Sequence, residues 1–77
     1  MRVVVMGAGG YVGSRLVPGL LAEGHDVVAT FTDVGSASRF WWAERVEAVQ
    51  MQVLDRGSVR DAAAGADALY YLIHGLA

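Results

Sequence analysis

The stretch that decides the fold is Arg2-Val3-Val4-Val5-Met6-Gly7-Ala8-Gly9-Gly10-Tyr11-Val12-Gly13. Its first part, Val3 to Met6, is a short continuous apolar run of the kind found in buried parallel strands. Glycines crowd the residues that follow, and an apolar pattern of helical period begins at Tyr11. This order predicts a strand that leads through a tight turn directly into a helix.

Three glycines of this stretch are spaced three residues apart and have separate expected roles. Gly7 lets the backbone reverse without a Cβ clash, Gly10 leaves room for a phosphate beside the main chain, and Gly13 lets the helix lie close on the strand. The N–H groups of the first helical turn, near Tyr11 and Val12, point at the turn and form an anion site with the helix dipole. The spacing is G-x-x-G-x-x-G and not G-x-G-x-x-G, so a glycine-rich turn without a ligand is the alternative.

Strands and helices alternate along the rest of the chain. The predicted strands cover residues 3–6, 26–31, 46–53 and 68–73, and the predicted helices cover residues 11–23 and 55–64, with a short helix through residues 38–40. Such alternation implies a parallel sheet with right-handed crossovers. The expected fold is therefore α/β: the N-terminal βαβαβαβ portion of a Rossmann-like, doubly wound, three-layer αβα architecture with strand order 3-2-1-4.

Local features of the helices complete this prediction. Ser36 is the expected N-cap of the short helix, and a capping-box pattern begins at Ser58. The adjacent Trp41 and Trp42 either pack in the core or contact a part of the protein beyond these residues. The first helix should bury one apolar stripe, formed by Val12, Leu16, Leu20 and Leu21.

The composition excludes several classes of protein. The chain has 77 residues, of which 55% are hydrophobic, with a net charge of −2 and a mean hydropathy of +0.39, which fits one domain over residues 1–77. Its six basic residues are scattered arginines, so no nucleic-acid-binding patch is expected. The absence of cysteine and the two distant histidines argue against a disulfide and a metal site. No apolar run reaches the ~18 residues of a membrane span, and we expect a cytoplasmic protein.

Several motifs resemble those of a known group of proteins. The residues from Val5 to Gly13 resemble the N-terminal fingerprint of extended and atypical short-chain dehydrogenases/reductases. Two later stretches, Trp42–Glu47 and Asp67–His74, are similar to the NmrA-like NAD(P)H-binding branch related to the 39-kDa subunit of respiratory complex I. The resemblance covers nearly all of this chain but only the N-terminal part of such proteins. It implies an NAD or NADP cofactor whose pyrophosphate lies at the glycine turn.

Ligands of doubly wound folds lie at the carboxyl ends of the strands, where the strand order reverses between the first and fourth strands. The residues that follow each predicted strand are therefore the candidates for cofactor binding. These candidates are Gly7, Gly9, Gly10, Tyr11, Val12, Gly13, Thr32, Asp33, Gln52, Val53, Leu72, Ile73 and His74.

Some of these positions differ from the pattern of the resembled proteins. Thr32 stands where NADP-binding relatives often have an arginine, which can grip the 2′-phosphate. Asp33 either bonds the ribose hydroxyls, as a carboxylate does in NAD-binding relatives, or caps the following turn, so the preference between NAD and NADP is open. Relatives commonly have Asp-Leu where Gln52 and Val53 stand, and Gln52 can still accept a hydrogen bond from the adenine amino group through its amide oxygen.

No catalytic residue is assigned. Short-chain dehydrogenases typically use Tyr-x-x-x-Lys, but this chain has no lysine, and four residues after its tyrosines stand Arg15, His74 and Gly75. His74 is either catalytic or a part of the strand-end motif that packs near the ribose or solvent. The expected function is an NAD(P)-binding Rossmann fragment of an oxidoreductase- or epimerase-like protein. The alternatives are a non-catalytic NAD(P)-sensing or structural module and an inactive truncated product.

The fourth predicted strand would lie at an open edge of the sheet. Its residues from Leu69 to Ile73 are all apolar or aromatic, and an unpaired strand edge is a pairing surface. We expect the chain to dimerise through this edge or to depend on a missing C-terminal segment that covers it.

Overall fold

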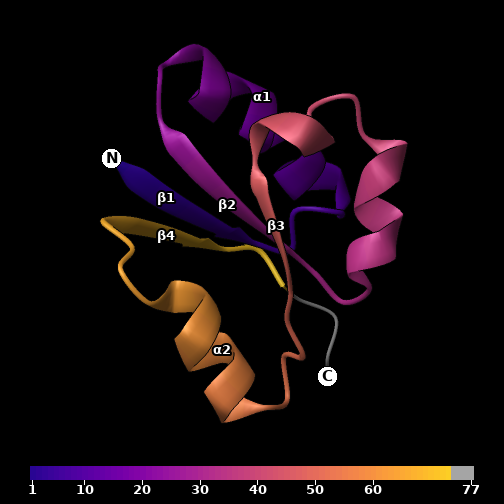
Figure 1. The fold of residues 1–77 in the computed structure, drawn as a ribbon, viewed down its shortest axis with the longest axis vertical. Coiled ribbons are helices and arrows are strands. Elements are labelled where there is room, and N and C mark those ends of the chain that lie inside the picture. The colour runs from indigo at the N-terminus through magenta and orange to yellow at the C-terminus, as the bar shows by residue number, and fades with distance from the viewer. Residues whose placement is uncertain (74–77) are drawn as a thin grey trace.

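The computed structural model describes residues 1–73, which form a four-stranded sheet and two α-helices (Figure 1). The elements in chain order are β1 (Arg2–Met6), α1 (Tyr11–Ala22), β2 (Asp26–Phe31), the 3-10 helices η1 (Val34–Arg39) and η2 (Ala43–Arg45), β3 (Glu47–Gln50), α2 (Arg56–Ala63) and β4 (Ala68–Tyr71). All strand pairs are parallel and the order is β3-β2-β1-β4. The predicted fold class and strand order are confirmed.

The sheet is built around β1. Val3 lies opposite Val27 of β2 on one side and opposite Ala68 of β4 on the other. Every residue of β1 from Val3 to Met6 is at most 1% exposed. Since helices cover both faces of the sheet, side chains pointing to either face are buried, and this explains the unbroken apolar run in the sequence.

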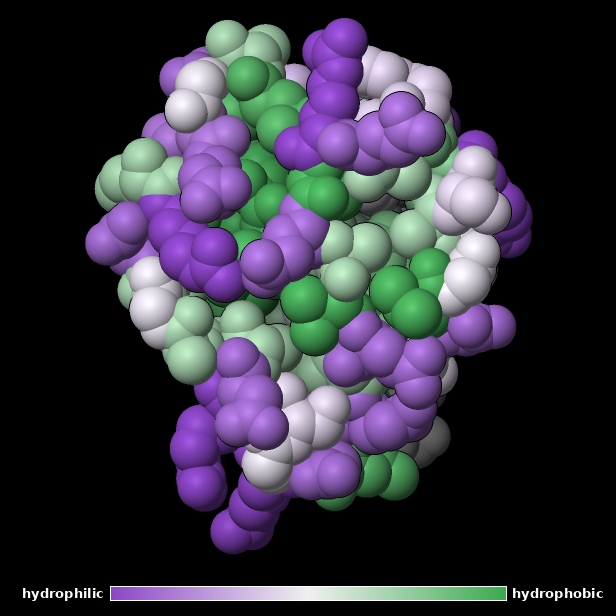
Figure 2. All heavy atoms as spheres, in the orientation of Figure 1, coloured by the Kyte–Doolittle hydropathy of each residue, from purple (hydrophilic) through white to green (hydrophobic). Residues whose placement is uncertain are grey.

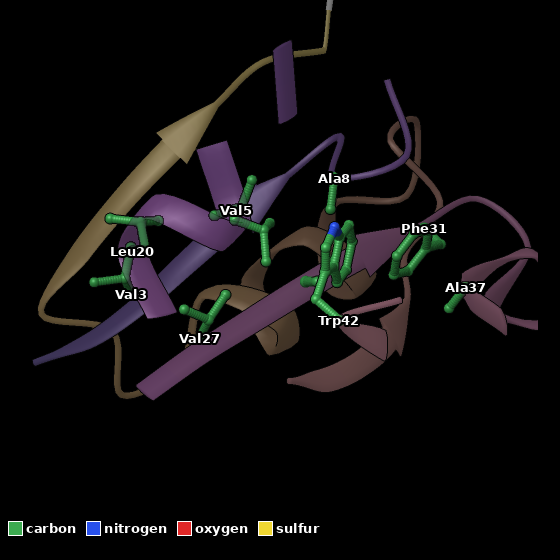
Figure 3. Close-up of a cluster of buried hydrophobic side chains, with 10 residues drawn as sticks. Val3, Val5, Ala8, Leu20, Val27, Phe31, Ala37 and Trp42 are labelled. Atoms are coloured by element: carbon green, nitrogen blue, oxygen red, sulfur yellow. The ribbon is translucent and has the colours of Figure 1, made fainter. Parts of the chain in front are cut away.

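One face of the sheet is covered by α1 and by the segment that contains η1 and η2 (Figure 3). The buried side chains of this face are Val3, Val5, Ala8, Val17, Leu20, Val27, Ala29, Phe31, Ala37 and Trp42. The ring of Trp42 stacks on that of Phe40, with 4.8 Å between their centroids. Trp42 is 1% exposed whereas Trp41 is 70% exposed. The core interpretation is therefore confirmed for Trp42 and wrong for Trp41.

The buried side of α1 differs from the predicted stripe. Gly13, Val17 and Leu20 are buried, whereas Val12 is 52% exposed. The reason is that Gly13 packs directly on the backbone of the turn after β1, which directs position 13 toward the sheet. Residues four and seven positions later share that side of the helix, while the preceding residue is rotated by roughly 100°.

The opposite face is covered by α2 (Figure 1). Val4, Met6 and Val28 of the sheet pack there against Met51 and Ala62. Helical segments thus cover both faces of the sheet, as the three-layer prediction required. The second cluster has fewer buried side chains than the first, to which the segment with η1 and η2 also contributes Ala37 and Trp42.

Aspartates cap the two helical segments for which serines were predicted. Asp33 accepts a hydrogen bond from the Gly35 N–H at 3.0 Å before η1, and Asp55 accepts one from the Ser58 N–H at 3.1 Å before α2. The predicted caps at Ser36 and Ser58 are wrong because both helices begin earlier. Each aspartate directly precedes the first residue of its helix. A carboxylate at that position also interacts favourably with the positive end of the helix dipole.

The strands at the two edges of the sheet are shorter than predicted and end at Gln50 and Tyr71. On β4, Leu69, Tyr70 and Tyr71 are 41% to 54% exposed. Figure 2 shows hydrophobic side chains that reach the surface between polar ones on the face it presents. Neither α-helix within residues 1–73 is long and apolar enough to cross a membrane. Pairing of the β4 edge with a second copy or a further segment stays a prediction.

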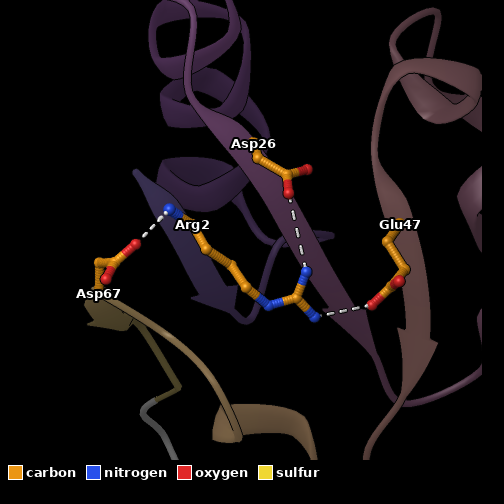
Figure 4. A network of polar contacts seen from close by, with 4 residues as sticks. All are labelled: Arg2, Asp26, Glu47 and Asp67. Carbon is orange, nitrogen blue, oxygen red and sulfur yellow. Dashed lines mark hydrogen bonds and ion pairs between the residues drawn. The ribbon is translucent and has the colours of Figure 1, made fainter.

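An arginine joins the strands at their amino ends (Figure 4). The Nη1 of Arg2 is 3.8 Å from the Asp26 carboxylate, and its Nη2 is 3.1 Å from that of Glu47. Its backbone N–H donates to the Asp67 carboxylate at 2.8 Å. These contacts link β1 to β2, β3 and the segment before β4, although partly exposed ion pairs of this kind each contribute little stability. These contacts lie at the amino ends of the strands, whereas the candidate site lies at their carboxyl ends.

Candidate functional site

Two cavities lie at the carboxyl ends of the strands and share Gly7, Gly10 and Ile73. The first has a volume of about 350 Å³ and is lined by Gly7, Gly9, Gly10, Thr30, Phe31, Thr32, Asp33, Ser36, Met51, Val53 and Ile73. The second has a volume of about 430 Å³ and is lined by Gly7, Gly10, Tyr11, Val12, Gly13, Leu72 and Ile73. Because the cavities adjoin at the glycine turn, one elongated ligand can extend across that turn from one to the other.

The cavities bring together most of the residues that the sequence singled out. Every candidate lines at least one of them, except Gln52 and His74. Gln52 lies beside the first cavity, where its side-chain N–H donates to the backbone oxygen of Thr32 at 3.3 Å. His74 lies outside the described residues. The proximity of these residues is a structural finding, while their individual roles toward a ligand stay predictions.

The turn between β1 and α1 has the geometry that its glycines allow. Gly7 has a φ of +91°, a conformation that other residues rarely adopt. Its carbonyl oxygen accepts a hydrogen bond from the Gly10 N–H at 3.1 Å. A Cβ atom on Gly13 would overlap that same oxygen and would lie 2.9 Å from the Cα of Ala8. Gly7 therefore provides the reversal of the chain, and Gly13 provides the close approach of α1 to it.

The amino end of α1 opens onto the cavities, because Gly10 lines both of them and Tyr11, Val12 and Gly13 line the second. Gly10 is its N-cap, and the first helical hydrogen bond runs from the Ser14 N–H to the Gly10 carbonyl at 2.9 Å. The N–H groups of residues 11–13 precede that bond and have no acceptor within the helix. In the described part of the chain, no side chain caps α1 and its first turn has no acidic residue. In contrast to α2 and η1, whose aspartates occupy this position, α1 leaves it open to an external anion.

The end of β2 supplies the polar side of the first cavity. Asp33 is exposed and lines the cavity, and its carboxylate caps η1. Of the two roles predicted for Asp33, the capping of the following turn is therefore observed, and the contact with a ribose stays a prediction. Neither arginine nor lysine lines this cavity in residues 1–73. The guanidinium of Arg15 instead lies 3.8 Å from the centre of the Tyr11 ring. The guanidinium of Arg39 lies 5.5 Å from the centre of the Phe40 ring.

Two glutamines, one at the end of β3 and one just after it, form hydrogen bonds with the segment that follows β2. The Gln52 side chain donates to Thr32, as described, and the Gln50 side-chain oxygen accepts a hydrogen bond from the Val34 N–H at 3.4 Å. The Gln52 N–H in turn donates to the Ser58 hydroxyl at 3.0 Å. The side-chain nitrogen of Gln52 donates in the contact with Thr32, and its amide oxygen is the atom of the side chain that can accept a hydrogen bond from a ligand.

Sequence reasoning missed four residues that line the first cavity: Thr30, Phe31, Ser36 and Met51. Phe31 and Met51 belong to the core clusters and extend to the cavity wall. Thr30 was visible in the sequence as a lone hydroxyl side chain within the apolar run from Val27 to Phe31. A polar side chain in a strand covered on both faces requires a hydrogen-bond partner, and this requirement is the signal that could have singled out Thr30.

A parallel sheet of order 3-2-1-4, with a glycine turn after its first strand and a cavity at the strand ends, defines a Rossmann-type nucleotide-binding domain. Comparison with known families agrees: the chain belongs to the NAD(P)H-binding family, whose model matches residues 7–76. The chain is also similar to tetraketide alpha-pyrone reductase 1 of Arabidopsis thaliana, with 31% identity in an alignment that covers 91% of the chain and 24% of the relative. The chain thus spans about a quarter of the length of this curated relative.

Proposed function

We propose that this chain binds the adenosine-diphosphate half of NAD(P)(H), with the pyrophosphate at the turn from Gly7 to Gly13. The observation that carries the proposal is the uncapped amino end of α1, which opens onto both cavities. An anion at this place accepts hydrogen bonds from the free N–H groups of the first helical turn and is stabilised by the helix dipole. Membership of the NAD(P)H-binding family supports the cofactor class.

The two cavities suit the two sides of such a pyrophosphate. The first offers exposed polar groups at Thr32 and Asp33 for a ribose, and apolar groups of Met51 and Val53 for an adenine ring. Gln52 follows Met51 and precedes Val53, which both line this cavity, and its amide oxygen would be the acceptor for the adenine amino group. The second cavity continues from the turn along Leu72 and Ile73, in the direction that the nicotinamide half would take.

Calorimetric titration of the 77-residue chain with NADH, ADP-ribose and adenosine tests the proposal. If the pyrophosphate is the principal anchor, NADH and ADP-ribose should bind with similar affinity. Adenosine, which lacks the pyrophosphate, should bind at least about tenfold more weakly. Equal affinity for adenosine and ADP-ribose, or no binding of any of the three, would contradict the assignment.

For the choice of cofactor, we predict that the chain prefers NADPH over NADH by at most about tenfold (~1.4 kcal/mol). The lining of the first cavity contains the carboxylate of Asp33 and, in residues 1–73, no cationic side chain to bind a 2′-phosphate. Thr32→Arg should shift the ratio of the two affinities toward NADPH, because a guanidinium can bind the phosphate with two hydrogen bonds. Thr32→Val is the matched control, since it removes the hydroxyl without adding charge and should leave the ratio unchanged. A thousandfold preference of the wild type for NADPH would show that another residue binds the phosphate.

For the whole protein we propose an NAD(P)H-dependent oxidoreductase, supported by the name of the similar protein as a reductase. The second candidate is a protein that binds the cofactor without turnover. These 77 residues contain no lysine and hence no Tyr-x-x-x-Lys, so this part of the protein assigns a catalytic residue to neither candidate. A Tyr-x-x-x-Lys in the protein sequence beyond residue 77 would favour the enzyme, and its absence there would favour the cofactor sensor.

A further inference from the structure

Thr30 lies beneath the glycine turn. It belongs to β2, pairs with Met6 of β1, and is 1% exposed. Of the buried residues within 1–73 it is the one with a polar side chain. A hydroxyl group in such a place costs free energy unless it forms a hydrogen bond, so its partner indicates why a polar residue is present.

That partner is the turn itself. The Thr30 hydroxyl accepts a hydrogen bond from the Gly7 N–H at 3.2 Å, and the Thr30 carbonyl accepts one from the Ala8 N–H, also at 3.2 Å. The carbonyl of Gly7 then accepts from the N–H of Gly10, the N-cap of α1. One threonine therefore binds two consecutive N–H groups of the turn, and the constraint continues through Gly7 to the N-cap of α1.

We propose that Thr30 is the positioning residue of the candidate anion site. Its hydroxyl holds Gly7 in the left-handed conformation and thereby sets the direction in which the free N–H groups at the start of α1 point. This role rests on the proposed function, because the anion it serves is the pyrophosphate of the cofactor. Thr30 acts through Gly7, the first residue of the turn that receives the anion, whose N–H its hydroxyl binds.

Valine matches threonine in shape but cannot accept a hydrogen bond. In a Thr30→Val variant the Gly7 N–H loses its acceptor, and the turn leaves its observed conformation in a fraction of the molecules. Apparent affinity falls in proportion to the fraction that retains the binding conformation. We expect ADP-ribose to bind about tenfold more weakly to Thr30→Val and within about twofold of the wild type to Thr30→Ser, which keeps the hydroxyl.

Calorimetry with ADP-ribose on these variants and on Val59→Ala tests the role. Val59 is partly buried against the second cluster on α2, away from the turn, so its truncation lowers stability without removing a contact of Gly7. Wild-type affinity in Val59→Ala, with loss in Thr30→Val and recovery in Thr30→Ser, supports the proposal. Equal affinity of Thr30→Val and wild type, or equal loss in Thr30→Ser and Thr30→Val, overturns it while leaving the proposed function standing. A wild type that does not bind ADP-ribose overturns both.

Amide hydrogen exchange of the wild type keeps the proposal testable if Thr30→Val does not fold. The Gly7 N–H should exchange as slowly as that of Val4 in the centre of β1, because its hydrogen bond ends on a buried hydroxyl. Exchange as fast as that of the Tyr11 N–H, which has no acceptor within α1, would show that the bond does not hold the turn and would overturn the proposal.

Discussion

Gly10→Val is expected to abolish dinucleotide binding while the fold survives. Gly10 has φ −80° and ψ 176°, which any residue can adopt. Among residues 1–73, a Cβ atom there would meet the Gly7 carbonyl oxygen alone, at the ordinary contact distance of 3.4 Å. Gly10 lines both cavities, so the valine methyl groups would occupy the space of the pyrophosphate. We expect the affinity for ADP-ribose to fall at least about a hundredfold (~2.8 kcal/mol).

The measurement is a calorimetric titration with ADP-ribose, combined with urea unfolding of the same preparations. Gly19→Val is the matched control, because it adds the same side chain to α1 outside both cavities, at a position where the new Cβ has no atom of residues 1–73 within 4 Å apart from its chain neighbours and the backbone of its own helix. The control should bind ADP-ribose like the wild type. A Gly10→Val protein that is folded and binds with wild-type affinity would show that the pyrophosphate lies elsewhere.

Gly13→Ala should have the opposite consequence and destabilise the fold of the domain. The new Cβ would overlap the Gly7 carbonyl oxygen and lie 2.9 Å from the Cα of Ala8. Both are backbone atoms of the turn, so no side-chain rotation relieves the overlap and α1 must move away from β1. Overpacking of this kind typically costs 1–3 kcal/mol, and we expect roughly 3 kcal/mol here because the clash is with backbone. That loss is a large fraction of the stability of a small domain.

Urea unfolding followed by circular dichroism measures this loss. Gly19→Ala makes the same chemical change in the same helix, where the added methyl group meets no other atom. It should raise the free energy of unfolding by about 0.5–1 kcal/mol, because alanine loses less backbone entropy in a helix than glycine does. A Gly13→Ala protein as stable as Gly19→Ala would show that the contact between α1 and the turn is looser than described.

The sequence by itself determined the architecture and the place of the candidate site. The apolar runs at 3–6 and 26–31 predicted strands buried on both faces, and their alternation with helices left few topologies for a parallel sheet. The carboxyl ends of parallel strands meet at one edge, so residues that follow different strands could be placed together before their contacts were known. Gly7, Thr32 and Val53, which are distant in the chain, do line one cavity.

Only the tertiary structure decided which of two similar apolar residues is buried in the core. Trp41 and Trp42 are identical neighbours, and contact with Phe40 and the core buries one of them. Val12 and Val17 are both apolar residues of α1, and the packing of Gly13 on the turn selects Val17 for the core. Whether each of these side chains is buried depends on contacts with other helices and strands, and the sequence around the residue does not specify those contacts.

The hydrogen bond between Gly7 and Thr30 shows the same limit at the candidate site. It joins residues 23 positions apart, and it forms because the register of β1 and β2 places Thr30 opposite Met6, next to the turn. The composition of each strand predicts that it is buried. The register in which two strands pair depends on both strands, so neither strand alone specifies it. The sequence therefore determined that a glycine turn exists here, and the pairing of the strands decided what holds that turn in its shape.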